Sequence, residues 1–230
     1  DSLMLNYDRW QINPNNSITV GTGIIARDFI LSQANQQLSV QSLGTGADSP
    51  LEVKLTAFQL STLTSFLQAD SALVDGVANG SVTFTNLMQQ PLFTGNLTIN
   101  DLAFQRDTVG NVNAQVSSNG STYTTNTTIT GRGNDIALTG NITPRGNDLA
   151  MDLDLAIRRF ALQSVRGAMK DFITDANGNL YGNVSISGTT SDPNIDGKIN
   201  FDNAVITTVA IGGPFLTIRK FSKDPFKVDD

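Results

Sequence analysis

The side chains that most enzymes use for proton transfer and nucleophilic attack are scarce in this sequence. It contains no histidine and no cysteine in 230 residues, which excludes Ser-His-Asp and Cys-His arrangements as well as thiolate metal sites. A serine activated by a lysine base needs neither residue, but no motif in the sequence supports such a pair. The sequence therefore predicts neither an enzyme nor a cofactor.

Carboxylates are the remaining candidates for catalysis, because a glycosidase needs only a pair of them. Asp152 and Asp154 form one such pair, and Asp101 and Asp107 form another. However, Asp152 and Asp154 alternate with the apolar residues of a predicted strand, which places them opposite its apolar face. We interpret them as solvent-facing side chains.

Two short stretches resemble ligand-binding loops without meeting their requirements. Residues 175–179 resemble a calcium loop, but the glycine is at the fourth position and Ile186 stands where the bidentate Glu belongs. Residues 44–48 contain two glycines, yet they lead into Pro50 and a strand rather than into a helix that could bind phosphate. The sequence predicts an Asn-Gly turn and a plain loop, and no metal site.

The composition points to a soluble, β-rich chain. Hydrophobic residues make up 39% and charged residues 16%, with abundant Asn, Thr, Ser and Gly. The net charge is -6, and no Lys/Arg cluster could neutralise successive phosphates, so we expect no nucleic-acid partner. No apolar run is long enough for a membrane-spanning helix, and Asp1 does not begin a signal peptide, which suggests an excised piece.

An internal repeat organises the chain: residues 51–104 align with residues 153–206 at a constant offset of 102. We expect one continuous segment, with repeat 1 at about 8–104, repeat 2 at 105–206 and the start of a further strand or repeat at 207–230; residues 10–45 look like a looser copy. Identities in the alignment are Leu51/Leu153, Phe58/Phe160, Leu60/Leu162, Gly76/Gly178, Gly80/Gly182, Val82/Val184, Pro91/Pro193 and Gly95/Gly197.

Each repeat contains the same predicted elements in the same order. A strand with apolar residues at every second position comes first, from Leu149 to Ile157 in repeat 2. A short amphipathic helix follows, and then a turn, a strand, a proline-bearing turn and another strand. The predicted helices rest on Leu60, Leu63 and Leu67 and on Leu162, Val165 and Met169, and the first turns on Asp75-Gly76 and Asn177-Gly178.

Residues 105–148 predict a meander of three strands between the two matched blocks. The strands span 112–116, 123–129 and 136–142, separated by Asn-Gly and Gly-rich turns. Residues 215–219 alternate again and predict one more strand. The expected fold class is all-β with short amphipathic helices, an elongated curled sheet built from tandem repeats of about 100 residues.

The chemistry that remains is apolar contact along one side of the strands. A second sheet or the helices could cover this side and give a closed core, or the sheet could curl around an open groove. The stripe from Leu149 to Ile157 spans about 27 Å at roughly 3.4 Å per residue, close to the roughly 30 Å of a bilayer core. The residues predicted to line the interior are Leu51, Val53, Leu55, Val82, Phe84, Leu97, Ile99, Leu149, Met151, Leu153, Leu155, Ile157, Val184, Ile186, Ile199 and Phe201.

The second repeat carries a motif that resembles a known family. Residues 182–204 contain a G-x-V-x-I-x-G strand, a D-P turn and a G-x-I-x-F-x-N-A strand, similar to the repeat of the TamB and AsmA-like family of Gram-negative bacteria. Repeat 1 departs from it, with Asn86 in place of Gly188, Gln90 in place of Asp192 and residues 101–102 in place of Asn-Ala. The resemblance covers roughly residues 34–206.

The resemblance implies a long periplasmic protein, anchored to the inner membrane by a segment outside this chain and folded into a β-taco-like trough. Family members are linked to phospholipid transport between the membranes and to outer-membrane protein assembly with a barrel partner of the Omp85 type. Three hypotheses follow: a trough for phospholipid or another apolar ligand, a scaffold or chaperone that pairs a sheet edge with a client strand, or a closed-core adhesin or stalk.

Overall fold

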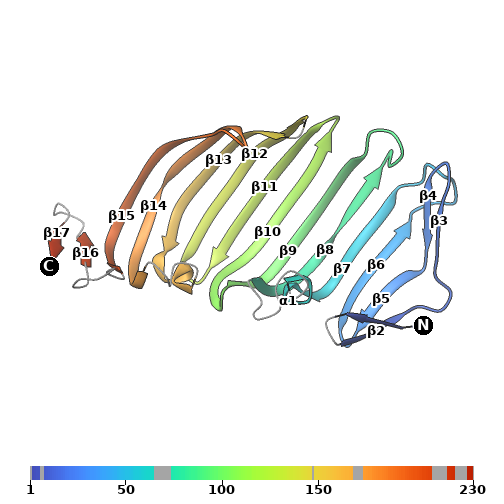
Figure 1. The fold of residues 1–230 in the computed structure, drawn as a ribbon, viewed down its shortest axis with the longest axis horizontal. Helices are drawn as coiled ribbons and strands as arrows, with labels where there is room; N and C mark the ends of the chain where they lie inside the picture. The colour runs from blue at the N-terminus through green and yellow to red at the C-terminus, as the bar shows by residue number, and fades with distance from the viewer. Residues whose placement is uncertain are drawn as a thin grey trace.

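The structure is a computed structural model that describes residues 2–5, 8–64, 74–146, 148–167, 173–208, 217–220 and 227–229. Fifteen of the strands form one antiparallel sheet, and each pairs with its neighbour in the chain, except that β3 and β4 pair only with each other. In Figure 1 the strands run side by side from the blue N-terminal end to the red C-terminal end, in a curled and open sheet. The all-β expectation is confirmed.

The strands are longest in the C-terminal half, where β14 has 17 residues and β15 has 16. The two helical elements are single turns. In chain order the elements are β1 Ser2–Leu5, β2 Asp8–Ile12, β3 Ser17–Val20, β4 Ile24–Arg27, β5 Phe29–Gln33, β6 Gln36–Ser42, β7 Leu51–Gln59, α1 Leu60–Thr64, β8 Val74–Thr85, β9 Leu92–Phe104, β10 Asp107–Asn119, β11 Thr122–Gly131, β12 Asn134–Arg145, β13 Asp148–Ala161, η1 Leu162–Val165, β14 Ile173–Thr189, β15 Pro193–Thr208, β16 Thr217–Lys220 and β17 Lys227–Asp229.

Two-residue turns set the register of the predicted meander. Asn119 pairs with Thr122 across a turn in which Gly120 has a φ of 59°. Gly131 pairs with Asn134 across Arg132 and Gly133, whose φ angles are 53° and 87°. Such turns match the twist of antiparallel strands. The three predicted strands are confirmed and extend further at both ends than the apolar alternation indicated.

The two repeats share their irregularities as well as their strands. The pairing of β7 with β8 shifts by one residue between Leu55 and Phe58, and that of β13 with β14 shifts between Ile157 and Phe160, 102 positions later. Each is a β-bulge, an extra residue that bends one strand against its partner. The repeat seen in the sequence therefore has the same local geometry in both copies.

The turns predicted at Asp75-Gly76 and Asn177-Gly178 were wrong. Both dipeptides lie inside long strands, β8 and β14, at further register shifts. Gly76 and Gly178 have φ angles of 139° and 95°, so the same positive angles that suit a turn serve a bulge here. The chain continues straight through each site because a neighbouring strand pairs on either side.

The predicted helices are present only as short turns in the described part of the chain. α1 covers Leu60–Thr64, and η1 covers Leu162–Val165 as a 3₁₀-helix rather than an α-helix. Leu67 and Met169, which completed the predicted helical spacing, lie outside the described residues. Leu60 and Leu162 pack against buried apolar clusters at the same end of the strands.

A buried side-chain amide fixes the strand-to-helix junction of repeat 1. The Oε1 of Gln36 accepts hydrogen bonds from the backbone N–H of Gln59 at 2.9 Å and from the Thr62 hydroxyl at 3.3 Å. Gln36 is only 5% exposed. Because the chain leaves the sheet at this point, its backbone N–H needs another acceptor, and Gln36 supplies it.

Repeat 2 uses Asn134 in the same way. Its Oδ1 accepts a hydrogen bond from the N–H of Ala161 at 2.7 Å, and its Nδ2 donates to the Ser164 hydroxyl at 2.8 Å and to the Val109 carbonyl at 2.5 Å. Ala161 and Ser164 lie 102 positions after Gln59 and Thr62. We call Gln36 and Asn134, with these partners, the amide clamps.

We expect Asn134→Ala to destabilise the protein by roughly 1–3 kcal/mol, because it leaves the buried Ala161 N–H and Val109 carbonyl without partners. The change appears as a lower urea midpoint in far-UV circular dichroism. Asn126→Ala, at an exposed position of the same sheet, is the matched control and should change the midpoint little. Equal midpoints for the two variants would contradict the role of the clamp.

Asp148 fastens the turn between β14 and β15 to the start of β13. Its carboxylate accepts hydrogen bonds from the hydroxyls of Ser191 and Thr190 and, at 2.9 Å, from the backbone N–H of Leu149. The hydroxyls of Ser191 and Thr190, which stabilise the charged form, lower the pKa of Asp148 far below its ordinary value. This contact lies at the end of the strands opposite η1.

Candidate functional site

All sixteen residues predicted to line the interior lie on one face of the sheet, which we call the apolar face. Directly paired residues of neighbouring strands project to the same side. Val53 pairs with Val82, and Leu55 pairs with Gly80, which pairs with Leu97. In repeat 2, Leu153 pairs with Ile186 and Leu155 pairs with Val184.

The strands between the two blocks make this face continuous. One row of paired residues crosses the sheet from Ile99 through Val112, Ile129 and Ile136 to Ile157. Sequence reasoning had placed strands here without assigning them to the lining. The two-residue turns in the sequence could have identified these lining residues, because such turns fix which residues of neighbouring strands lie opposite each other. The large side chains missed are Phe93, Val112, Val116, Tyr123, Ile129, Ile136, Leu138, Ile142 and Ile195.

Two threonine hydroxyls interrupt the apolar face on β11. Thr125 pairs with Val116, and Thr127 pairs with Ala114, so both side chains lie among apolar neighbours. Their hydroxyls hydrogen-bond to each other at 3.0 Å. Since each hydroxyl has a hydrogen-bond partner, placing the two among apolar side chains costs less free energy than placing two unpaired hydroxyls there.

Aromatic rings gather on the apolar face near the β8–β9 loop. The ring centroids of Phe84 and Phe93 are 6.2 Å apart, and those of Phe93 and Tyr123 are 5.3 Å apart. Ser118 of β10 lies between the latter two, and its hydroxyl accepts a hydrogen bond from the N–H of Phe93. A small residue there lets the two rings meet across an intervening strand.

The apolar face is only partly covered. Of the sixteen predicted residues, Leu51, Leu153 and Ile157 are buried, with 8–9% exposure. Leu149 is 39% exposed and Ile199 is 45% exposed, and Ile195 beside them reaches 67%. A closed two-layer core would bury most of these side chains. The described part of the sheet therefore presents accessible apolar surface, as the open alternative requires.

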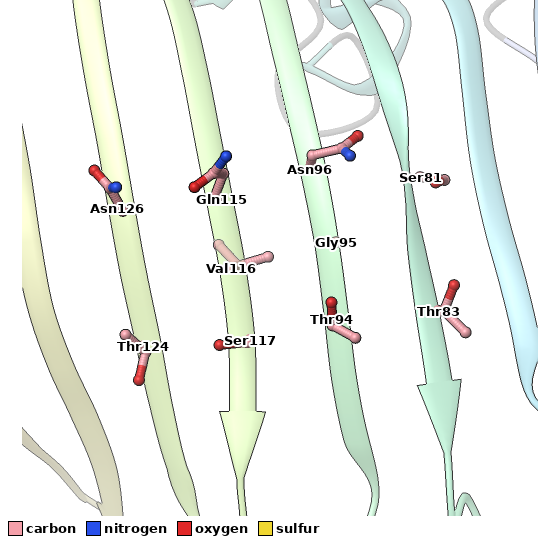
Figure 2. Close-up of a pocket in the computed structure, with 10 residues that line it drawn as sticks. All are labelled: Ser81, Thr83, Thr94, Gly95, Asn96, Gln115, Val116, Ser117, Thr124 and Asn126. Carbon is pink, nitrogen blue, oxygen red and sulfur yellow. The ribbon is translucent and has the colours of Figure 1, made fainter.

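The opposite face is polar, and it carries the carboxylates considered above. Asp152 and Asp154 are both exposed there. A hollow of about 520 Å³ lies on the same face over β8 to β11 (Figure 2). None of its lining residues is titratable, so it offers hydrogen bonds and no acid or base. The hollow is lined by the polar-face residues Ser81, Thr83, Thr94, Asn96, Gln115, Ser117, Thr124 and Asn126, together with Gly95 and Val116, which alternate with them along β9 and β10.

The other candidate sites have structural roles. Asp101 lies 3.5 Å from the Arg132 guanidinium, and Asp107 accepts a hydrogen bond from the N–H of Gly167. Residues 175–179 belong to the bulged strand β14 rather than to a loop. Within the described ranges, no cluster of three or more His, Cys, Asp or Glu side chains could hold a metal ion. No helix in those ranges is long and apolar enough to cross a membrane.

Comparison with known proteins identifies the C-terminal half of this arrangement. Residues 124–223 match the family model described as the TamB C-terminal domain. Comparisons with curated proteins and with solved structures gave no significant match. The matched range contains most of β11 and all of β12 to β16, including the G-x-V-x-I-x-G motif on which the resemblance rested. Residues 124–223 are therefore similar to the TamB C-terminal domain, and the match supports a TamB-family fragment.

Proposed function

We propose that this chain is a non-catalytic periplasmic part of an envelope-spanning protein, and that its apolar face carries the acyl chains of phospholipid between the inner and outer membranes. The TamB match supports a role in envelope assembly or lipid transport in general. The specific role assigned to the apolar face is our inference from the geometry. An inner-membrane anchor outside this chain and an Omp85-type barrel partner are parts of the proposal that rest on the family.

The observation that carries the proposal is an apolar face that runs from β7 to β15, with the paired hydroxyls of Thr125 and Thr127 as an interruption on β11, while its residues stay partly exposed. The row from Ile99 through Val112, Ile129 and Ile136 to Ile157 crosses five strands in register with an apolar side chain on each. A carrier needs such continuity because an acyl chain that moves must exchange one apolar contact for another. Exposed apolar rows in a large patch mark a binding surface rather than an ordinary exterior.

The hydrophobic effect supplies enough free energy for this role. Each methylene removed from water contributes about 0.8 kcal/mol, so five shielded methylenes contribute about 4 kcal/mol. A single row of side chains shields only part of an acyl chain from water, so each contact contributes only a few kcal/mol. Modest contacts repeated across many strands allow a lipid to be held without being trapped.

The first test is the recovery of lipid from the purified protein. We expect organic extraction of the chain, purified from a Gram-negative host without detergent, to release phospholipid that mass spectrometry identifies. The purified chain should also accelerate transfer of a fluorescent phospholipid from donor to acceptor vesicles. If repeated extractions release no phospholipid and transfer does not exceed the protein-free rate, the proposal is wrong.

The two rival hypotheses predict other outcomes of the same work. A scaffold that pairs a sheet edge with a client strand should lose client binding when proline enters that edge, with lipid recovery unchanged. A closed-core stalk should yield no lipid, and charge on its inner face should only lower stability. The partial exposure of Leu149, Ile195 and Ile199 favours the carrier over the stalk.

A further inference from the structure

The sheet has two long borders of different construction. We call the border that carries α1, η1 and the turns at residues 105–106 and 132–133 the helix edge. The opposite border, with the β8–β9, β10–β11, β12–β13 and β14–β15 connections, is the hairpin edge. In Figure 1 the helical turns lie along the lower border and these hairpins along the upper one.

The helix edge is sealed in both repeats. In repeat 1, Phe58 and Ala78 are buried with Trp10, and Leu60 of α1 packs against them. In repeat 2, Leu162 of η1 is buried with Ala176 and Ala204. These are the two buried clusters of the described chain, and both lie at this border. An acyl chain that reached the helix edge would therefore meet a packed wall.

The amide clamps hold that wall in place. Gln36 bonds the junction before α1, and Asn134 bonds the junction before η1. Both amides are at least 95% buried, so water cannot replace their hydrogen bonds cheaply. A buried amide holds the strand-to-helix junction in both repeats, which indicates that the packed helix edge is a feature of the repeat itself.

From β8 to β15, the described part of the hairpin edge carries no buried apolar cluster. On the apolar face, Leu149 and Ile195 lie beside this border and are 39% and 67% exposed. Met88, in the β8–β9 loop, is 54% exposed. Near β6 and β7 this border is covered by the β3–β4 hairpin, where the N–H of Ala26 donates to the Ser42 hydroxyl.

We infer that a phospholipid lies across the apolar face with its chain ends against the helix edge and its polar head at the hairpin edge. This orientation rests on the proposed function. The strand from Leu149 to Ile157 is about 27 Å long, whereas one leaflet of acyl chain spans about 15 Å, so the tails fit between the borders. The polar head then sits beside water at this border.

The single tryptophan of the chain is a built-in probe of this orientation. Trp10 is 1% exposed, and its ring lies 5.8 Å from that of Phe58 in the wall of the helix edge. Bromine quenches tryptophan only at close range. We expect phosphatidylcholine brominated at the chain ends to quench Trp10 at least twofold more than the same lipid brominated next to the glycerol.

A label at the opposite border should show the reverse order. The chain contains no cysteine, so Ile195→Cys places a fluorophore at one exposed site of the hairpin edge. Bromine next to the glycerol should quench this fluorophore more than bromine at the chain ends. Lipid can bind and yet quench both probes most strongly from the same bromine position, or quench each probe from the position opposite to the one expected. Either result would mean that the inferred orientation is wrong while the proposed function stands. If extraction shows that no lipid binds, both fail.

Discussion

Gly182→Ala is expected to destabilise the protein by roughly 2–5 kcal/mol. A Cβ at this position would lie 2.0 Å from the backbone carbonyl oxygen of Lys198. Because that atom belongs to the paired strand β15, it cannot move aside without breaking the ladder. The φ of 157° adds strain for any residue with a Cβ.

The position is informative because repeat 1 has the same arrangement. Gly80 lies 102 positions earlier, and its Cβ would lie 2.1 Å from the carbonyl oxygen of Asn96. Both glycines allow adjacent strands to approach closely, and such positions let a long sheet bend. We expect Gly80→Ala to have an effect of similar size.

The measurement is urea unfolding followed by circular dichroism. Gly21→Ala is the matched control, because no heavy atom lies within 4 Å of the added Cβ, and its midpoint should stay near that of the unmodified chain. A Gly182→Ala midpoint that also stays there would show that the close approach of β14 and β15 is not required for folding.

The second large effect is on lipid binding rather than on folding. We expect the double variant Ile195→Asp and Ile199→Asp to reduce recovered phospholipid at least tenfold. A carboxylate against hydrocarbon costs about 2.5–3.5 kcal/mol, which is roughly a hundredfold in affinity for each site that a tail contacts. Both isoleucines are substantially exposed, so the fold should tolerate the charges.

The matched control adds the same charge to the other side of the same strand. Asn194 and Asn200 alternate with the two isoleucines and belong to the polar face, so Asn194→Asp with Asn200→Asp should leave lipid recovery unchanged. Equal losses in the two double variants would mean that net charge, and not the apolar face, decides lipid binding. If both double variants retained as much phospholipid as the unmodified chain, Ile195 and Ile199 would not belong to the binding surface.

The sequence was sufficient wherever a strand's own residues decide the outcome. Alternation from Leu149 to Ile157 assigned each side chain to a face, because successive residues of a strand point to opposite sides whatever the partner is. Within each strand the predicted lining residues share one face for this reason, and the register between strands brings all sixteen to the same side. The offset of 102 likewise predicted two copies of one arrangement, and the copies share even their bulges.

Errors arose where one local pattern fits two structures. Asn177-Gly178 supports a turn or a bulge equally well, since both need a positive φ. The presence of paired strands on both sides of β14 decides between them. The clamp formed by Asn134 was also invisible, because its partners Val109, Ala161 and Ser164 lie 25 to 30 residues away.

By itself, then, the sequence determined an all-β repeat chain with one apolar side, because composition, period and spacing are properties of neighbouring residues. Only the tertiary structure decided that this side stays partly open and that one border is sealed while the other is not. Those features depend on how far the sheet curls and on which distant residues meet at its borders. Both are set by pairing and packing between strands, which no single strand encodes.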